Sequence, residues 1–181
     1  MEIIKTPIQD LLIVKPRIFT DARGFFCETY HEMRYQQAGI TARLVQDNQS
    51  QSTYGVVRGL HFQREPYAQA KLLSVSVGMV WDVAVDLRKD SPTFGQWFGV
   101  ELSAENHLQF FIPRGFAHGF SVLSPTVLFT YKCDNFYTPE AESGLFYADP
   151  NLHIDWKVPA DKIIVSEKDN VLPLLRDWQR F

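Results

Sequence analysis

The sequence predicts an all-β protein, a double-sheet jelly roll of many short strands with a few short helices, mainly near the C-terminus. Apolar and polar residues alternate in short segments along much of the chain, and turn residues separate these segments. Aromatic residues make up 14% of the chain, and aromatic side chains favour strands. Segments with the periodicity of a helix are scarce, which also favours a strand-rich fold.

The longest alternation covers residues 72–87, where every odd position is large and apolar. This segment is too long for one ordinary strand, so we expect Gly78 to mark a bend between two strands. Residues 30–39 predict a helix that ends at a glycine, and residues 169–179 predict a weaker one interrupted by Pro173. Residues 90–95 form a turn, and further strands are expected at 96–103, 107–113, 119–124 and 127–136.

The length and the net charge of the chain limit the classes of protein to which it can belong. With 181 residues, we expect one domain over residues 1–181, long enough to bury a core without a metal or disulfide staple. The net charge of −3 argues against a nucleic-acid-binding protein, which normally carries a basic surplus. The sequence therefore gives no reason to expect a nucleic-acid partner.

The sequence also bears on the compartment. Apolar runs fall short of the roughly 20 residues of a membrane span. Charges at Glu2, Lys5 and Asp10 interrupt the N-terminal segment, so it lacks the apolar stretch of a signal peptide. Cys27 and Cys133 have no CxxC spacing and are interpreted as reduced thiols. We therefore expect a cytoplasmic protein without a membrane partner.

The stretch RGLHFQ (58–63) places an arginine and a histidine in a segment that otherwise resembles a buried strand. One interpretation is a strand whose polar side chains face water. The other is that Arg58 and His61 line a polar pocket inside the barrel. Ideal alternation would direct these two side chains to opposite faces, so the second interpretation requires an irregularity, which we expect at Gly59.

A second stretch, IPRGFAHGF (112–120), places Pro113, Gly115 and His118 at a spacing similar to the second motif of the cupin superfamily, whose histidine is commonly a metal ligand. The first cupin motif needs a pair of histidines, but here Gln63 stands where the second would follow His61. Catalytic zinc or iron normally takes three protein ligands. We therefore predict no metal site, and a hydrogen-bonded core histidine is the simplest interpretation of His118 alone.

Without a metal, an acid–base set remains. His61 has an ordinary pKa of about 6.5, which suits proton abstraction at neutral pH. Lys71 opens the long alternating segment, where a solvated strand end is the alternative explanation. Tyr131 is equally explained as a core tyrosine with a bonded hydroxyl, and Asp169 as a helix N-cap. None of these signals is specific by itself.

Taken together, seven stretches resemble the dTDP-4-dehydrorhamnose 3,5-epimerase family, metal-free cupin enzymes of deoxysugar-nucleotide biosynthesis. The resemblance covers nearly the whole chain in the family's order and implies a cupin-type double-stranded β-helix. Gln49, Phe62 and Phe136 depart from the family pattern at positions without an assigned catalytic role. The stretches are DARGFFCETY (21–30), VQDNQSQSTYGVVRGLHFQ (45–63), PYAQAKL (66–72), GMVWDVAVDLRKDSPTFG (78–95), IPRGFAHGF (112–120), YKCDNFYTPEAE (131–142) and SEKD (166–169).

The resemblance also implies roles for residues. His61 would be the general base, oriented by Asp169, and Tyr131 the general acid. Lys71 would lie near the developing negative charge on the sugar. The implied substrate-binding residues, which would surround the sugar, the thymidine and the diphosphate, are Phe19, Arg23, Glu28, Gln46, Asn48, Arg58, His118, Tyr137 and Lys168.

The activity implied is that of an isomerase without a cofactor or a metal. It would invert C3 and C5 of dTDP-4-keto-6-deoxyglucose through enolate intermediates to give dTDP-4-keto-L-rhamnose. Family members form homodimers in which N-terminal residues of one subunit complete the partner's pocket. Two alternatives stay open: an epimerase that acts only at C3 or only at C5, and a non-catalytic cupin that binds a sugar nucleotide.

Overall fold

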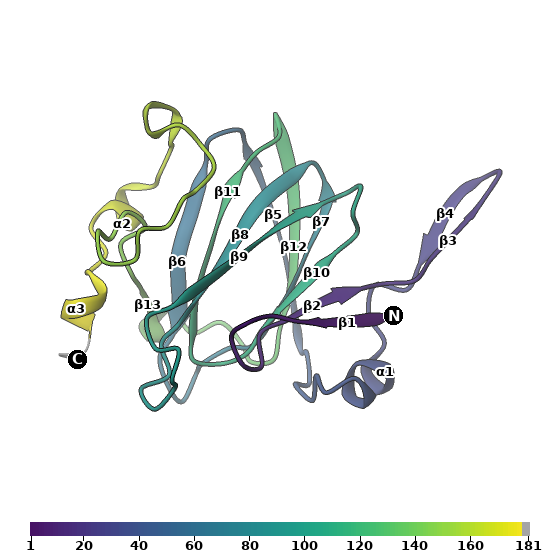
Figure 1. The fold of residues 1–181 in the computed structure, drawn as a ribbon, viewed down its shortest axis with the longest axis horizontal. Coiled ribbons are helices and arrows are strands. Elements are labelled where there is room, and N and C mark those ends of the chain that lie inside the picture. Colours follow the sequence, from purple (N-terminus) through teal and green to yellow (C-terminus); the bar gives the residue numbers. More distant parts are fainter. Residues whose placement is uncertain (179–181) are drawn as a thin grey trace.

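The structure, a computed structural model, describes residues 1–178 and consists mainly of two antiparallel sheets that face each other (Figure 1). The six-stranded sheet has the strand order β1-β2-β10-β7-β12-β5, and the five-stranded sheet has the order β13-β6-β11-β8-β9. A separate two-stranded hairpin, β3–β4, projects from the body. This arrangement confirms the predicted all-β double-sheet fold with a few short helices.

The elements have the following bounds. The first sheet contains β1 (Glu2–Lys5), β2 (Leu12–Lys15), β5 (Gln46–Thr53), β7 (Lys71–Val77), β10 (Gln109–Ile112) and β12 (Thr126–Cys133). The second contains β6 (Val57–Gln63), β8 (Met79–Asp86), β9 (Trp97–Ser103), β11 (Phe116–Val122) and β13 (Glu142–Gly144). The hairpin is β3 (Ile18–Asp21) and β4 (Gly24–Cys27), and the helices are α1 (Glu32–Gln37), α2 (Glu167–Asn170), α3 (Leu175–Trp178) and the 3₁₀ turns η1 (Pro139–Ala141) and η2 (Ala160–Lys162).

Gly78 separates β7 from β8, as the alternation predicts. Its φ of +79° belongs to the left-handed region, and a Cβ there would collide with the backbone oxygen of Thr126. The bend changes which positions face the space between the sheets. On β7 the odd positions face inward, including Leu73, whereas on β8 the even positions do, including Ala84.

Apolar clusters bury both faces of β8, and a further cluster packs Tyr35 of α1 with Leu72 and Phe111 on the outer face of the six-stranded sheet. One cluster on β8 fills the space between the sheets and includes Phe110 and Phe129. The other covers the outer face of the five-stranded sheet, where Val83 and Val85 pack with Leu152 of the C-terminal segment. The barrel is therefore closed on its outer side by the end of the chain (Figure 1), which also carries α2 toward β6.

The first predicted helix occurs in shorter form, and parts of two separate short helices stand in place of the second. Residues 30–39 contain α1, which is followed by Gly39 in a left-handed conformation with φ of +92°. Residues 169–179 contain the end of α2 and the whole of α3, which lie on either side of Pro173; the last residue, Gln179, lies outside the described residues. Within residues 1–178, no helix combines the length and the apolar character needed to cross a membrane.

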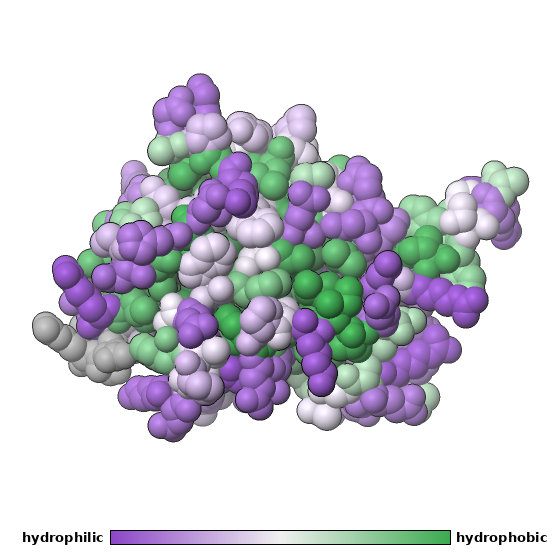
Figure 2. Space-filling view, viewed as in Figure 1, coloured by the Kyte–Doolittle hydropathy of each residue, from purple (hydrophilic) through white to green (hydrophobic). Residues whose placement is uncertain are grey.

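The β3–β4 hairpin was not predicted from the sequence. It turns at residues 22 and 23, just before Gly24, whose φ is +124°. It exposes three aromatic rings, with Phe19, Phe25 and Phe26 exposed by 49%, 60% and 68%. Figure 2 shows apolar surface on this arm. Exposed aromatic side chains on a projecting arm are typical of an interaction surface.

Candidate active site

The site begins with a bulge in β6. His118 of β11 pairs with His61, but Phe120, two residues later, pairs with Arg58, three residues away on β6. One extra residue on β6 therefore lies between the two pairs, which defines a β-bulge. Gly59 occupies it with φ of +135°, and a Cβ there would collide with the backbone of β11. The predicted irregularity is confirmed, and it places Arg58 and His61 on the same side of the strand.

His61 is paired with a carboxylate from the other end of the chain. Its Nε2 lies 2.7 Å from Oδ1 of Asp169, although 108 residues separate the two. Asp169 also accepts a hydrogen bond of 3.2 Å from the backbone N–H of Gly59. The N-cap of α2 is Ser166, whose side chain accepts from the N–H of Asp169. The N-cap explanation for Asp169 is therefore wrong, since its carboxylate points to His61.

The contact with Asp169 defines the chemistry available to His61. Burial acts to raise the pKa of Asp169, but the hydrogen bond with His61 and the N–H of Gly59 outweigh it, and the pKa lies below its usual range. Asp169 is thus an anion that accepts Nε2–H. The hydrogen-bond network assigns the proton to Nε2, so Nδ1 carries the lone pair of the neutral ring. A lone pair held in this way can accept a proton.

A second histidine–aspartate pair lies on the neighbouring strands. Nε2 of His118 is 3.0 Å from the carboxylate of Asp82 on β8, and Asp82 is fully buried. Burial lowers the pKa of His118 and outweighs the opposing effect of Asp82. Sequence reasoning missed Asp82, although an aspartate within a strand that is buried on both faces is itself a signal.

Lys71 and Tyr131 enter the same interior from the six-stranded sheet. Lys71 opens β7, as predicted, and pairs with Cys133 of β12. Burial lowers the pKa of Lys71, against the raising effects of nearby groups that include Asp82. Burial likewise raises the pKa of Tyr131, so its hydroxyl stays protonated and can donate. The interior therefore holds groups that can accept and donate protons.

Aromatic rings form the floor beneath these polar groups. The rings of His118 and Phe129 stack with centroids 6.2 Å apart, and Phe129 lies 6.1 Å from Tyr131. Phe120 and Phe129 stack at 4.3 Å. Packing against Phe129 holds the rings of His118 and Tyr131 in place. The aromatic rings also exclude water from that side of the interior, which strengthens electrostatic interactions there.

A polar cluster forms one rim of the interior. The hydroxyl of Tyr137 donates to Oε2 of Glu142 at 2.7 Å, and Nζ of Lys168 lies 2.6 Å from the same oxygen. The backbone N–H of Tyr137 donates to Gln46 at 2.9 Å. The structure thus brings three predicted binding residues together around Glu142. Sequence reasoning did not assign Glu142, although it ends one of the stretches that carry the resemblance.

Two more predicted residues border β5, since Asn48 belongs to this strand and Arg58 reaches it from β6. Asn48 accepts from the side chain of Gln46 at 3.0 Å and faces Cys133. Arg58 donates from Nε to the hydroxyl of Ser52 at 3.0 Å, which holds the guanidinium at the rim. These contacts place amide and guanidinium groups where they can meet polar groups of a ligand.

Three predicted binding residues lie elsewhere in the chain. Phe19 and Arg23 belong to the β3–β4 hairpin, and Glu28 follows it. Arg23 contacts Asp21 at 2.6 Å, and Glu28 contacts Arg34 at 2.9 Å. The hairpin projects from the end of the molecule opposite α2 (Figure 1). Within one chain, the structure does not bring these residues to His61.

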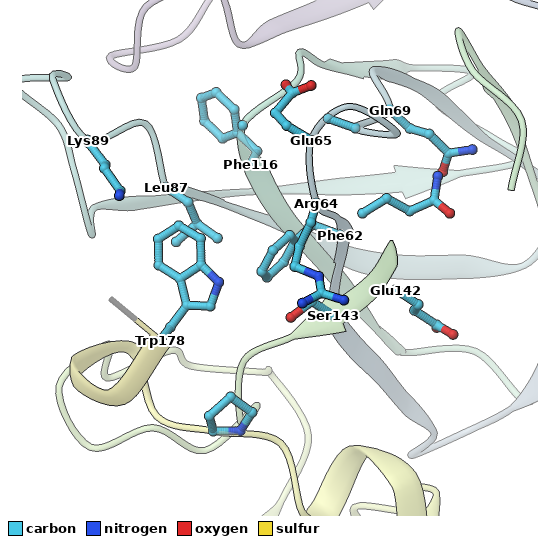
Figure 3. Close-up of a pocket in the computed structure, with 14 residues that line it drawn as sticks. Phe62, Arg64, Glu65, Gln69, Leu87, Lys89, Phe116, Glu142, Ser143 and Trp178 are labelled. Atoms are coloured by element: carbon cyan, nitrogen blue, oxygen red, sulfur yellow. The ribbon is translucent and has the colours of Figure 1, made fainter. Parts of the chain in front are cut away.

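A cavity of about 510 Å³ lies on the outer face of β6 (Figure 3). Phe62, Arg64 and Trp178 line it, and the rings of Phe62 and Trp178 meet edge to face at 5.6 Å. Because neighbouring residues of a strand point to opposite faces, this cavity lies across β6 from His61. Its lining also includes Glu142, so the cavity reaches the polar cluster at the rim of the interior.

For residues 1–178, the structure contains no group of three or more His, Cys, Asp and Glu side chains that could hold a metal ion. Both interior histidines instead direct Nε2 to a carboxylate. The fold and the site together define a jelly-roll protein whose interior carries acid–base groups suited to proton transfer.

Comparison with known proteins identifies the family. The sequence profile of the dTDP-4-dehydrorhamnose 3,5-epimerase family matches residues 5–177. A dTDP-4-dehydrorhamnose 3,5-epimerase from Shigella flexneri is 52% identical over 170 residues, which is 93% of either chain. The chain belongs to the dTDP-4-dehydrorhamnose 3,5-epimerase family.

Solved structures agree with this assignment. The crystal structure of the dTDP-4-dehydrorhamnose 3,5-epimerase from Elizabethkingia anophelis matches with a TM-score of 0.94 and 54% identity, over 98% of this chain and 97% of that one. An epimerase from Legionella pneumophila, solved in complex with dTDP-4-keto-L-rhamnose, matches with a TM-score of 0.93 and 52% identity, over 97% and 93% of the two chains. The fold is therefore that of the cupin-type epimerases.

Proposed function

We propose that the protein inverts C3 and C5 of dTDP-4-keto-6-deoxyglucose and gives dTDP-4-keto-L-rhamnose. The observation that carries this proposal is the pairing of His61 with Asp169 at 2.7 Å in an interior that Tyr131 and Lys71 share. The similarity to 3,5-epimerases at about half-identical sequence supports the substrate class.

The chemistry follows from the ketone at C4, which acidifies the C–H bonds of C3 and C5. Nδ1 of His61 removes a proton from one face, and the electron pair moves to the C4 oxygen as an enolate. Tyr131 then donates a proton to the same carbon from the opposite face, which inverts the centre. Positioned proton transfer of this kind contributes roughly 10²–10⁴-fold to the rate.

Lys71, assisted by His118 and Arg58, stabilises the negative charge that develops on the enolate oxygen. A preorganised donor at such an oxyanion contributes about 10²–10³-fold. Burial strengthens this interaction because the interior screens charge less than water does. The reaction uses proton transfer alone, without a redox cofactor or a metal.

The rim residues bind the nucleotide. Tyr137 stacks on the thymine, and Gln46 and Asn48 contact the substrate. Lys168 and Arg58 meet the diphosphate. Nζ of Lys168 lies 2.6 Å from Oε2 of Glu142, which also accepts a hydrogen bond from Tyr137. Glu142 therefore sets the position of both Lys168 and Tyr137. Because the rim residues bind the nucleotide, His61 is left to act on the sugar.

The protein acts as a homodimer, and the β3–β4 hairpin of one subunit completes the site of the other. The exposed Phe19, Phe25 and Phe26 on the arm support this arrangement, in which Arg23 meets the diphosphate and Glu28 the thymine. Mixing inactive His61→Ala and Arg23→Ala proteins should form heterodimers with one intact site and restore turnover. Failure to restore it after confirmed subunit exchange would count against the shared site.

Residues 1–181 function as one domain, and the protein works in the cytoplasm. The family profile spans residues 5–177, which supports a single functional unit. The structure gives Cys27 and Cys133 as free thiols, and free thiols are typical of a reducing compartment.

The test is incubation with dTDP-4-keto-6-deoxyglucose in deuterated water. Each inversion replaces a carbon-bound hydrogen with deuterium from the solvent. We expect deuterium at both C3 and C5, detected by NMR or mass spectrometry. Label at one carbon alone would identify a single-site epimerase, and no label at either would identify a non-catalytic binding protein.

A further inference from the structure

Gln63 is a buried polar side chain that the proposed reaction does not use. It is the last residue of β6 and is only 7% exposed. In the cupin pattern this position carries the second histidine of the first motif, and here an amide takes its place. Buried polar side chains in native proteins are hydrogen-bonded, so the partners of this amide indicate what it does.

Both ends of the Gln63 amide bond to backbone groups. Nε2 donates to the carbonyl oxygen of Tyr67 at 2.8 Å and to that of Phe136 at 3.2 Å. Oε1 accepts from the backbone N–H of Thr138 at 2.6 Å. Two carbonyl oxygens beside one end and an N–H beside the other assign the nitrogen and the oxygen of the amide. Gln63 therefore joins the loop after β6 to the segment after β12.

Two of these three hydrogen bonds lie on either side of Tyr137, because Phe136 and Thr138 are its neighbours in the chain. The N–H of Tyr137 itself donates to Oε1 of Gln46 at 2.9 Å. Residues 136–138 lie outside any helix or strand, and Phe136 and Tyr137 are exposed by 65% and 51%. Side-chain packing therefore holds this segment weakly, and the amides of Gln63 and Gln46 attach its backbone to the two sheets.

The pairing of β6 with β13 provides a second attachment for Tyr137. Gln63 lies directly opposite Glu142 in this pair, and Glu142 accepts a hydrogen bond of 2.7 Å from the hydroxyl of Tyr137. Residues directly opposite each other lie on the same face of a sheet, with Cβ atoms about 5 Å apart. One cross-strand pair thus holds Tyr137 at both ends, with Gln63 at the backbone and Glu142 at the hydroxyl.

The three backbone partners suit a glutamine better than other polar side chains. A primary amide carries two N–H donors on one atom and an acceptor on the other. A neutral histidine would offer a single N–H donor. An ionised glutamate would offer acceptors only and would place one of them against the carbonyl oxygens of Tyr67 and Phe136. The hydrogen-bonding pattern therefore favours an amide at position 63.

We propose, building on the role of Tyr137 in the function above, that Gln63 is a positioning residue for nucleotide binding. Its amide fixes the backbone on both sides of Tyr137 and so presents this ring to the thymine of the substrate. Gln63 acts through Tyr137 and does not touch the substrate. Loss of the amide should weaken nucleotide binding and leave proton transfer by His61 and Tyr131 intact.

The test is Gln63→Met, which keeps a long, unbranched side chain and removes the amide. Because a displaced ring loses much of its stacking on the base, we expect the Kd for dTDP and the KM to rise about 5- to 50-fold. The value of kcat should stay close to that of the wild type, as expected when only uniform binding is lost. Calorimetric titration and steady-state kinetics measure both, and an unchanged Kd in a folded variant would overturn the proposal.

Gln69→Met is the matched control. Gln69 lies on the loop after β6, and its Nε2 donates to the carbonyl oxygen of Asn135 at 2.7 Å. It therefore links the same two segments but contacts neither neighbour of Tyr137. We expect this variant to keep the wild-type Kd for dTDP. A rise as large as that in Gln63→Met would overturn the proposal, because general loosening of the two segments would then be sufficient.

A double-mutant cycle with Tyr137→Ala tests whether the effect of Gln63 passes through the ring. When the ring is absent, Gln63→Met should add little to the loss of dTDP affinity. Independent, additive losses would overturn the proposal. An unchanged affinity in Tyr137→Ala would overturn it as well, because Gln63 would then have no binding group to position.

A measurement on the wild-type protein covers the case in which Gln63→Met does not fold. Hydrogen exchange followed by NMR should be slow for the N–H of Thr138 and for the side-chain amide of Gln63, since both are hydrogen-bonded. Rapid exchange at either group would overturn the proposal. A wild-type protein that binds dTDP without turning over dTDP-4-keto-6-deoxyglucose would instead refute the proposed function, and the dTDP titrations would still test Gln63.

Discussion

Two aspartates of β8, Asp82 and Asp86, are both fully buried and lie on the same face of the strand. Their surroundings are opposite. Asp86 accepts hydrogen bonds from the side chains of Arg88, Ser91 and Thr93 at 2.6–2.9 Å. Among the described residues, the Asp82 carboxylate has one hydrogen-bond partner, Nε2 of His118, which lies 3.0 Å from both of its oxygens.

The pKa values follow this difference. Burial acts to raise the pKa of Asp86, but the hydrogen bonds from Arg88, Ser91 and Thr93 outweigh it and lower the pKa to about 2. Burial raises the pKa of Asp82, and His118 and Lys71 offset only part of the effect. The comparison indicates that Asp86 stabilises the fold, whereas Asp82 belongs to a region whose charges are arranged for chemistry.

The largest expected effect lies in the interior. His61→Ala should lower kcat by roughly 10²–10⁴-fold, because the base is lost, while dTDP binding stays nearly intact. Steady-state kinetics together with calorimetric titration of dTDP checks both parts. A variant that keeps more than about a tenth of the wild-type rate would show that His61 is not the sole base.

The next largest effect is expected at Asp86, the last residue of β8, and it is an effect on stability. Asp86→Asn removes a carboxylate whose lowered pKa corresponds to about 2 kcal/mol at neutral pH. For a protein of this length, that loss lowers Tm by about 4–8 °C, while kcat stays close to wild type. A thermal melt and a kinetic assay of the same sample test this, and an unchanged Tm would contradict the structural role.

The smallest expected effect is the pH dependence of that stability difference. Since the pKa of Asp86 is lower in the folded protein, its stabilisation is fully present above pH about 4 and is lost as the pH falls toward 2. Melts of wild type and Asp86→Asn should therefore converge under acid conditions. A gap in Tm that stays constant down to pH about 2 would assign the loss to packing instead of charge.

The alternation of apolar residues was enough to predict the central strands and the bend at Gly78, because each strand there buries at least one face. It did not predict β5, whose residues are all polar. The inward positions of β5, such as Asn48, line the site, and its outward positions face solvent. The β3–β4 hairpin escaped prediction as well, since its aromatic rings do not pack into the core of the chain.

The site was predicted in part. Gly59 signalled that Arg58 and His61 face the same side, and the bulge confirms it. The contact between His61 and Asp169 spans 108 residues, so spacing alone could not reveal it, and the resemblance to the family supplied it. Asp82 was not found because its significance depends on which face of β8 points inward, and Gly78 changes that face.

The central claim is that one base and one acid act on opposite faces of the sugar, and Tyr131→Phe tests it most directly. The variant keeps the ring that packs against Phe129 but lacks the proton donor, while His61 can still remove and return a proton on its own face. An NMR time course in deuterated water should show exchange at C3 or C5 with little inverted product. Epimerisation at the wild-type rate would contradict the claim.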